Sequence, residues 1–327
     1  MASPSDEKTN QAVIIATRGS ALALVQAKHV QSTLQGLFPQ RRFELKVFKT
    51  TGDQLQALRD DQPSGQTLPK GLFTKELEVA LLDGTADLAV HSLKDLPTEL
   101  PASLCLGAIT QREDAREMLI LKQPVNASIQ HPRELLPKGA VIATNSPRRA
   151  AQIRAWDKTL KITPMRGNVP TRLAKLAEEG RIHGSVLAVA GLNRLGYSLE
   201  EEGRLIGPEA PEGLFAHLIE TDHLLPCVGQ GCLGIEIREG DQAIAELVKA
   251  LEHAPSAIAA QAERHFLKAM GGGCQTPYAA HARLLDHGGL KLMGKAFHGE
   301  ACLEAELQGN EDQAVELGEQ LAEALKP

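Results

Sequence analysis

The chain has 327 residues and a formal net charge of −6 at pH 7, and aromatic residues make up only 3% of it. This charge gives no bulk attraction to nucleic acid or to an anionic membrane, and so few aromatic side chains argue against platforms that stack bases. Apolar residues make up 43%, which is enough to build hydrophobic cores. At roughly 100–200 residues per domain, the length predicts two or three domains.

The N-terminus and the cysteines indicate a cytoplasmic protein. Residues 1–11 are polar, carry both signs of charge and contain no apolar run, so we expect no signal peptide. The longest apolar runs, such as residues 186–190, are far too short to span a membrane. Five cysteines is an odd number, which favours reduced thiols. Cys227 and Cys232 have no matching second pair, so we expect no metal site.

Strands and helices are expected to alternate over the first two-thirds of the chain. Ser20 is a good N-cap for a helix over residues 21–34, and Ser146 with Pro147 predicts the start of another. A further helical pattern covers residues 72–82. The alternation predicts doubly wound α/β sheets with parallel strands. Short apolar, β-branched runs predict the strands at residues 12–16, 45–49, 86–90, 140–143, 161–164 and 185–189.

The last part of the chain has a different pattern. A helix is predicted over residues 256–270, and the glycines that follow it are expected to end it. Alternating segments and a final helix near residues 311–325 then indicate a small α+β domain. Two other stretches read as irregular surface. Residues 56–70 are expected to form a mobile loop, and residues 198–225 a surface insertion.

Arginines recur where predicted strands end and helices begin. Ligands of open α/β sheets bind at this edge, and arginine forks bind carboxylates or phosphates at two points. An acidic protein that gathers cations there is expected to bind a ligand with several carboxylates or phosphates. For any single arginine, an ordinary surface charge remains the alternative. No Walker loop or Gly-x-Gly-x-x-Gly motif supports a nucleotide. The arginines in question are Arg18, Arg148, Arg149, Arg166, Arg172 and Arg194.

Two further residues are candidates for chemistry. Asp95 closes the segment after the strand at residues 86–90, where a carboxylate could stabilise a developing cation or relay protons. The alternative is an aspartate that caps a turn before Pro97. Cys274 follows three glycines, a loop that can present a thiol in a cramped place. A single cysteine is more often a small buried apolar residue, so this alternative also stays open.

Seven motifs in a fixed order resemble those of the porphobilinogen deaminases. The resemblance extends from about residue 12 to about residue 280 and weakens toward the C-terminus. Seven ordered motifs make a chance agreement negligible. The motifs are ATRGSALAL at 16–24, KGLFTKELE at 70–78, ADLAVHSLKDLP at 86–97, RGNVPTR at 166–172, LAVAGLNR at 187–194, VGQG at 228–231 and GGCQTP at 272–277.

The resemblance implies a transferase that condenses four porphobilinogen molecules into hydroxymethylbilane with loss of four ammonia molecules. It implies one dipyrromethane cofactor, held by a thioether on Cys274, and a catalytic role for Asp95. The family's arginines that hold acetate and propionate groups match the six arginines given above. Arg18, Ser20, Arg149, Arg166 and Arg172 are the expected substrate contacts, and Lys70 belongs to the expected lid. Further contacts to the cofactor match Lys94, Ser20, Thr144 and Ser146.

The family fold implies two doubly wound domains like those of periplasmic binding proteins and a small α+β C-terminal domain. We expect the first at residues 1–110 and 232–249, the second at 116–225 and the third, which carries Cys274, at 254–327. A cytoplasmic monomer without nucleic-acid or membrane partners is expected. The alternatives are a non-catalytic two-lobed anion-binding protein, which usually has a secretion signal, and an inactive relative, which would be expected to lack Asp95 or Cys274.

Overall fold

The computed structural model describes residues 12–52, 73–126, 128–273 and 275–327. The chain separates into two compact units, which are described one at a time. Within the described residues, the first unit contains residues 12–52, 73–112 and 232–257, and the second contains residues 113–231 and 258–327. Lys70, Cys274 and the loop expected at residues 56–70 lie outside the described residues.

The first unit is a five-stranded sheet in the order β2-β1-β3-β12-β4. The β1, β2 and β3 strands are parallel, as predicted, but β12 runs antiparallel to both of its neighbours. The sheet is therefore mixed, because β12 enters it from a chain segment that returns from the second unit. The strands are β1 (Val13–Arg18), β2 (Phe43–Phe48), β3 (Leu88–Ser92), β4 (Leu104–Ile109) and β12 (Leu233–Arg238).

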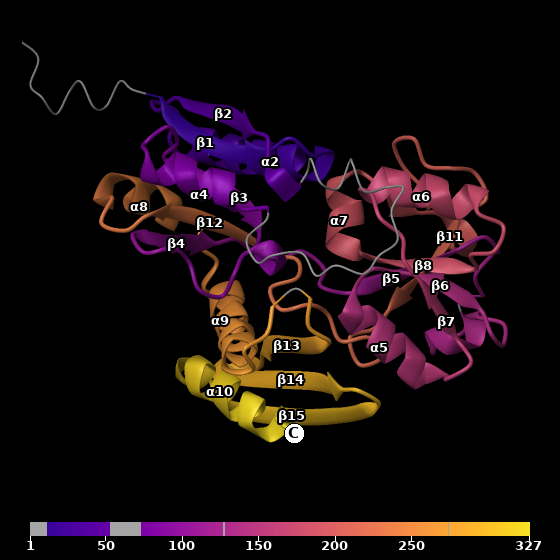
Figure 1. Cartoon of the computed structure of the whole chain (residues 1–327). Coiled ribbons are helices and arrows are strands. Elements are labelled where there is room, and N and C mark those ends of the chain that lie inside the picture. The colour runs from indigo at the N-terminus through magenta and orange to yellow at the C-terminus, as the bar shows by residue number, and fades with distance from the viewer. Residues whose placement is uncertain (1–11, 53–72, 127, 274) are drawn as a thin grey trace, which may run out of the picture. The chain divides into compact units, whose positions relative to one another are not determined.

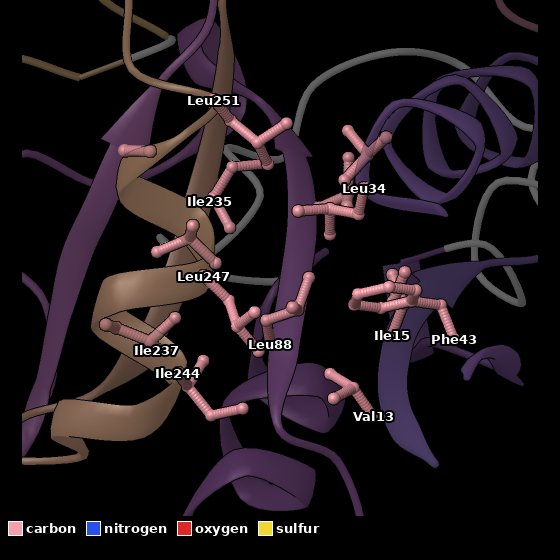
Figure 2. Close-up of a cluster of buried hydrophobic side chains, with 14 of the residues drawn as sticks. Val13, Ile15, Leu34, Phe43, Leu88, Ile235, Ile237, Ile244, Leu247 and Leu251 are labelled. Carbon is pink, nitrogen blue, oxygen red and sulfur yellow. The ribbon is translucent and has the colours of Figure 1, made fainter. Parts of the chain in front are cut away.

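Helices cover both faces of this sheet, which makes the unit doubly wound. On one face, α2 (Ala21–Leu37) and α8 (Gln242–Lys249) bury side chains against the strands. Figure 2 shows this cluster, in which Leu34 of α2 and Ile244 and Leu247 of α8 meet strand residues such as Ile15 and Leu88. On the other face, α4 (Lys75–Leu82) packs through Leu77 and Leu81.

The second unit contains a second five-stranded sheet, in the order β11-β5-β8-β6-β7. Its β6, β7 and β8 strands are parallel, whereas β5 is antiparallel to β8 and to β11. Helices α6 and α7 share one hydrophobic cluster with the sheet, and α5 shares another. These elements are β5 (Glu117–Leu121), β6 (Val141–Ala143), β7 (Lys161–Thr163), β8 (Gly184–Ala188), β11 (Phe215–Ile219), α5 (Pro147–Trp156), α6 (Val169–Glu178) and α7 (Val189–Arg194).

The prediction that residues 198–225 form a surface insertion is wrong. Leu205 and Leu214 are buried in the same cluster as α6, and β11 forms the edge strand of the sheet. A short hairpin, β9 (Ser198–Leu199) with β10 (Leu205–Ile206), precedes it. The glycines and prolines of this segment lie in turns between these strands. The strands and the residues beside them add apolar side chains to the core.

The C-terminal part of the second unit is α+β, as predicted. Strands β13 (Tyr278–Leu284), β14 (Gly289–His298) and β15 (Ala301–Asn310) form an antiparallel sheet. Gly271 has a φ of 64°, the left-handed conformation that commonly ends a helix, just after α9 (Ala254–Ala269). In Figure 1, α10 (Ala314–Leu325) lies along β14 and β15, and the two helices share one hydrophobic cluster with the sheet. We propose this part as a domain of its own, because it has its own sheet and its own core.

Candidate active site

A pocket in the first unit lies at the carboxyl ends of β1 and β3, next to the first turn of α2. This is the edge at which ligands of open α/β sheets bind. The pocket brings together three residues that were predicted for the site, namely Arg18, Ser20 and Asp95. Its polar wall consists of Arg18, Ser20, Gln26, Thr74, His91, Ser92 and Asp95.

Asp95 is held in the pocket by the short 3₁₀ turn that follows β3, Leu93–Asp95. Leu93 and Leu96 are buried, and the Leu93 amide donates to the carbonyl of Cys232 at 3.0 Å. The turn is thus anchored on both sides of Asp95, whose own side chain is exposed. No residue in the described part of the chain donates a hydrogen bond to its carboxylate. The carboxylate therefore does not serve as a turn cap and faces the pocket available for chemistry.

The opposite wall of the pocket suits an anion. Ser20 is the N-cap of α2, as predicted, and its Oγ accepts from the amide of Ala23 at 3.3 Å. The guanidinium of Arg18 lies over the ring of Phe73, 4.3 Å from its centroid. A helix N-terminus with a fixed arginine beside it favours a carboxylate or phosphate. The pocket therefore offers a cationic wall and a carboxylate to one ligand.

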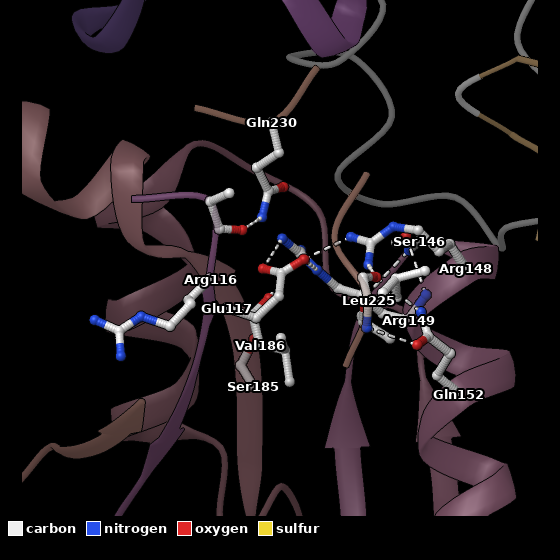
Figure 3. A network of polar contacts seen from close by, with 12 residues as sticks. Arg116, Glu117, Ser146, Arg148, Arg149, Gln152, Ser185, Val186, Leu225 and Gln230 are labelled. Carbon is white, nitrogen blue, oxygen red and sulfur yellow. Dashed lines mark hydrogen bonds and ion pairs between the residues drawn. The ribbon is translucent and has the colours of Figure 1, made fainter. Parts of the chain in front are cut away.

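In the second unit, the junction of β6 and α5 holds the predicted pair Arg148 and Arg149. Ser146 caps α5 and Pro147 is its first residue, as predicted. Both arginines are buried, and both pair with Glu117 of β5 (Figure 3). Glu117 is 2.5 Å from a terminal nitrogen of Arg148 and 2.7 Å from one of Arg149.

Backbone carbonyls take further donors of these two arginines. Arg148 donates to the carbonyl of Leu225 at 2.6 Å, and Arg149 donates to that of Val186 at 2.9 Å. Thr144 is also buried and its Oγ1 accepts from the amide of Ser146 at 3.2 Å, which orients the turn. The cluster holds two cations and one anion, so it keeps a net positive charge in a fixed geometry.

Arg172 adds a third cation near this cluster. Its Nε donates to the carbonyl of Gly167 at 2.8 Å. Burial and the positive charge of Arg149 lower the pKa of Arg172 to about 10. Gly167 has a φ of 116°, a conformation that favours glycine, in the turn that follows Arg166. This site therefore has more positive charge than its own residues neutralise, which favours an anionic ligand.

The remaining predicted residues are placed as follows. Lys94 lies beside Asp95 in the same turn, and Arg166 is half-buried between β7 and α6. Arg194 ends α7 and donates to the carbonyl of Gly231 at 2.6 Å, in the VGQG segment. The thiol of Cys274 and the amine of Lys70 belong to residues that the structure does not describe.

Sequence reasoning missed the buried acids Glu117 and Glu236. Each was visible as a charged residue inside an apolar strand, EMLIL at 117–121 and LGIEIR at 233–238, where burial demands a partner. His91 and Gln26 were also missed, although both lie in the matched or adjoining segments of the chain. The nearness of Gln26 to Asp95 depends on the pairing of β1 and β3, which sequence spacing alone does not show, whereas His91 precedes Asp95 in the same segment.

Comparison with known proteins gives two family matches. The model described as "Porphobilinogen deaminase, dipyromethane cofactor binding domain" matches residues 13–246, and "Porphobilinogen deaminase, C-terminal domain" matches residues 257–327. The porphobilinogen deaminase of Syntrophomonas wolfei is 42% identical over 313 residues, covering 95% of this chain and 94% of that protein. That of Gloeobacter violaceus is 43% identical over 320 residues, covering 97% and 91%.

Among solved structures, the periplasmic aliphatic sulphonate binding protein SsuA of Escherichia coli is similar with a TM-score of 0.38 and 14% identity. The match covers 80% of this chain and 70% of that one. Separately, none of the helices in the described ranges combines the length and apolar character that crossing a membrane requires.

Proposed function

Since the chain belongs to the porphobilinogen deaminase family, we propose that Asp95 is its catalytic carboxylate. The family reaction is a transfer that joins four porphobilinogen molecules head to tail into hydroxymethylbilane and releases four molecules of ammonia. The observation that carries the proposal for Asp95 is its exposed carboxylate in one pocket with Arg18 and the N-terminus of α2.

The chemistry needs both walls of this pocket. Porphobilinogen carries two carboxylates, which Arg18 and the free amides at the start of α2 can bind. Loss of ammonia from its aminomethyl group leaves a cation that is delocalised over the pyrrole. The anchored turn holds the Asp95 carboxylate in place before the reaction, so its charge stabilises the cation without reorganisation.

The dipyrromethane cofactor of the family supplies the free pyrrole α-carbon from which the chain is extended. The second unit fits such a group, because Arg149 and Arg172 repel each other and a ligand carboxylate would relieve this repulsion. We propose that Cys274 anchors the cofactor and that Lys70 belongs to a lid. The residues proposed to hold the cofactor are Lys94, Ser20, Thr144, Ser146, Arg148, Arg149, Arg166, Arg172 and Arg194, and those proposed to bind substrate are Arg18, Ser20, Arg149, Arg166 and Arg172.

The same proposal includes a cytoplasmic monomer that binds no nucleic acid. The net charge of −6 and the small number of aromatic residues support the part of this proposal that concerns nucleic acid. The alternative of a non-catalytic anion-binding protein is not favoured, because the family model that matches residues 13–246 is a cofactor-binding domain.

Two measurements test the site. Asp95→Asn should lower the rate of hydroxymethylbilane formation by about 10²–10³-fold, as for loss of one preorganised charge in an active site. Asp83→Asn is a matched control, since Asp83 is an exposed carboxylate at the end of α4 outside this pocket. The intact mass should exceed the polypeptide mass by two porphobilinogen units less two ammonias, and Cys274→Ser should lack this excess. Near-normal turnover in Asp95→Asn, or an unchanged excess mass in Cys274→Ser, would contradict the respective role.

A further inference from the structure

A buried histidine that lines the Asp95 pocket forms a pair with a buried glutamate. His91 of β3 lines the pocket, and its Nε2 lies 3.0 Å from Oε2 of Glu236 on the neighbouring strand β12. The side chains are 3% and 0% exposed, so neither group is a surface charge. The other oxygen of Glu236, Oε1, is buried and has no hydrogen-bond partner among the described residues. Among the described residues, the structure therefore shows one hydrogen-bond partner for the side chain of Glu236, which is His91.

Several other titratable groups face this pair. Glu78 approaches it from α4, and Cys105 approaches Glu236 from β4. Burial raises the pKa of Glu78, and the nearby charge of Glu236 adds to this rise. Arg18 of β1 and Asp95 share the pocket with His91, and α2 contributes the neutral Gln26. The groups that face the pair from α4 and β4 are thus acidic, whereas Arg18 is the cation that lines the same pocket as His91.

The hydrogen bond fixes how the ring can act. When Glu236 is ionised, its carboxylate only accepts hydrogen bonds, so Nε2 of His91 then carries the ring hydrogen and Nδ1 of the neutral ring carries a lone pair. The carboxylate also stabilises the imidazolium that forms when Nδ1 takes a proton. This is the logic of a carboxylate–histidine pair in acyl transfer, in which the buried acid orients the base. Here the histidine of the pair lines the pocket that contains Asp95.

We propose that His91, positioned by Glu236, is a second catalytic residue that accepts the proton lost from the pyrrole α-carbon in each condensation. The inference rests on the function proposed above. In the step, the carbon–nitrogen bond of the protonated aminomethyl group of porphobilinogen breaks, and ammonia leaves with the electron pair of that bond. The resulting cationic carbon then bonds to the free α-carbon of the terminal pyrrole. The carbon–hydrogen bond at that α-carbon breaks, its electron pair restores the aromatic ring, and the proton passes to Nδ1 of His91 and then to solvent. Asp95 keeps the role of stabilising the cation.

The tautomer of His91 provides a test that does not depend on turnover. Nitrogen-15 NMR of the histidine-labelled protein as purified, with His91 assigned by its disappearance in His91→Gln, should show a protonated Nε2 and an unprotonated Nδ1 at pH 8. In Glu236→Gln this preference should be lost, whereas Glu252→Gln should preserve it. Glu252 is a fair control, because its carboxylate accepts a backbone hydrogen bond from Ile109 in the same unit and does not line the pocket. A protonated Nδ1 in the unsubstituted protein overturns the proposal.

The isotope effect on condensation tests the proton transfer itself. His91→Gln should lower the rate by about 10²-fold, the usual contribution of a positioned base. With porphobilinogen deuterated at its free α-carbon, His91→Gln should also show a larger isotope effect than the unsubstituted protein, because proton loss becomes slower than bond formation. Glu236→Gln should change both quantities in the same direction and by less. His253→Gln serves as the control, since His253 pairs with Ser256 outside the pocket.

The outcomes separate this inference from the proposed function. If the unsubstituted protein forms no hydroxymethylbilane, the proposed function fails. If the unsubstituted protein and His253→Gln form the product, and His91→Gln does so with an unchanged rate and isotope effect, only the role of His91 is overturned. If His91→Gln does not fold, the isotope effect of Glu236→Gln and the tautomer in the unsubstituted protein decide.

Discussion

Glu117 accepts two hydrogen bonds from Arg149, one from Nε at 3.0 Å and one from a terminal nitrogen at 2.7 Å. The same carboxylate accepts from Arg148, and all three side chains are buried. Buried ion pairs are seldom the most stable solution for a core, because each charge must be desolvated. Their presence beside Arg172 supports the view that this part of the second unit is arranged in advance for an anionic ligand.

Glu117→Gln should destabilise the protein. The substitution leaves two buried guanidinium groups without a counter-charge, which costs about 3–5 kcal/mol in similar cases. Urea unfolding at pH 7 measures the free energy of unfolding. Glu220→Gln is the control, because Glu220 pairs with Arg116 while its side chain is 62% exposed, and such pairs contribute about 1 kcal/mol or less. If the two variants lost the same free energy of unfolding, the buried Glu117 cluster would contribute no more to stability than an exposed ion pair.

In a Cys274→Ser background, which we expect to lack the cofactor, Arg149→Gln should lower the stability of the protein, whereas Arg172→Gln should preserve or raise it. Arg149 is paired with Glu117, so its substitution removes a partner of this buried carboxylate and lowers the stability of the protein. Arg172 has a pKa of about 10, below its ordinary value of 12.5. The native state therefore binds this proton more weakly than the unfolded chain does. This unfavourable contribution is fully present below pH 10 and is relieved only as the pH rises above it.

In thermal unfolding at pH 7, Arg172→Gln should consequently unfold at the same or a higher temperature than the Cys274→Ser parent. The gain in the free energy of unfolding should be at most about 1 kcal/mol, because the variant also loses the hydrogen bond from Arg172 to Gly167. Arg149→Gln should unfold at a lower temperature. Strong destabilisation by Arg172→Gln would indicate that its cation is already neutralised within the chain, and the argument for an anion at this site would lose its support.

Stability on the acid side of neutrality should depend on His131. Its Nδ1 accepts from the amide of Arg133 at 3.1 Å, and its ring lies 4.6 Å from that of His223. Burial, followed by the neighbouring His223, lowers the pKa of His131. Because the native state holds the neutral ring, the unfolded chain takes up the proton first as the pH falls through 6.5. Stability from this group is therefore present above pH 6.5 and declines below it.

His131→Asn separates this effect from the hydrogen bond. Asparagine also accepts from a backbone amide at an N-cap but does not titrate. Urea midpoints at pH 7.5 and 5.5 should therefore differ less in His131→Asn than in the unsubstituted protein, while the two proteins are similar at pH 7.5. The same difference between pH values in both proteins would assign the acid sensitivity to other groups, such as His217, whose pKa is also lowered by burial.

Local patterns predicted the elements that lie along the parallel parts of the sheets. Ser20 and Ser146 cap helices as their positions indicate, and the alternation of strands and helices led to the doubly wound fold. The antiparallel direction of β5 and β12 was not predicted, because the direction of a strand depends on which neighbours it pairs with. The patterns also missed β15, whose side chains alternate between exposed and half-buried positions and so give a weak apolar signal.

The candidate site was partly predictable for a related reason. Residues at the ends of predicted strands, such as Arg18 and Asp95, could be placed at one edge of a sheet, and the structure brings them into one pocket. Glu236 could not be placed there, because it is more than 140 positions from His91 in the sequence and reaches it through strand pairing. Which arginines are held by Glu117 likewise depends on packing rather than on spacing.

The contact between α9 and α10 gives a prediction about packing in the C-terminal part. Gly318 of α10 faces the carbonyl of Ala262 so closely that a Cβ atom would overlap this backbone oxygen. Gly318→Ala should therefore push the helices apart and destabilise the protein by about 1–3 kcal/mol, as for overpacked cores. Gly36→Ala is the matched control, because Gly36 lies within α2 and a Cβ there meets nothing within 4 Å.

Since alanine favours a helix over glycine, Gly36→Ala should stabilise the protein by about 0.5–1 kcal/mol. The same glycine-to-alanine change thus has opposite signs at two helical positions, and the difference isolates the close approach of α10 to α9. Urea unfolding of both variants measures it directly. Stabilisation by Gly318→Ala would mean that α10 can move away from Ala262 without loss of the Leu321 and Phe266 contacts in the shared core.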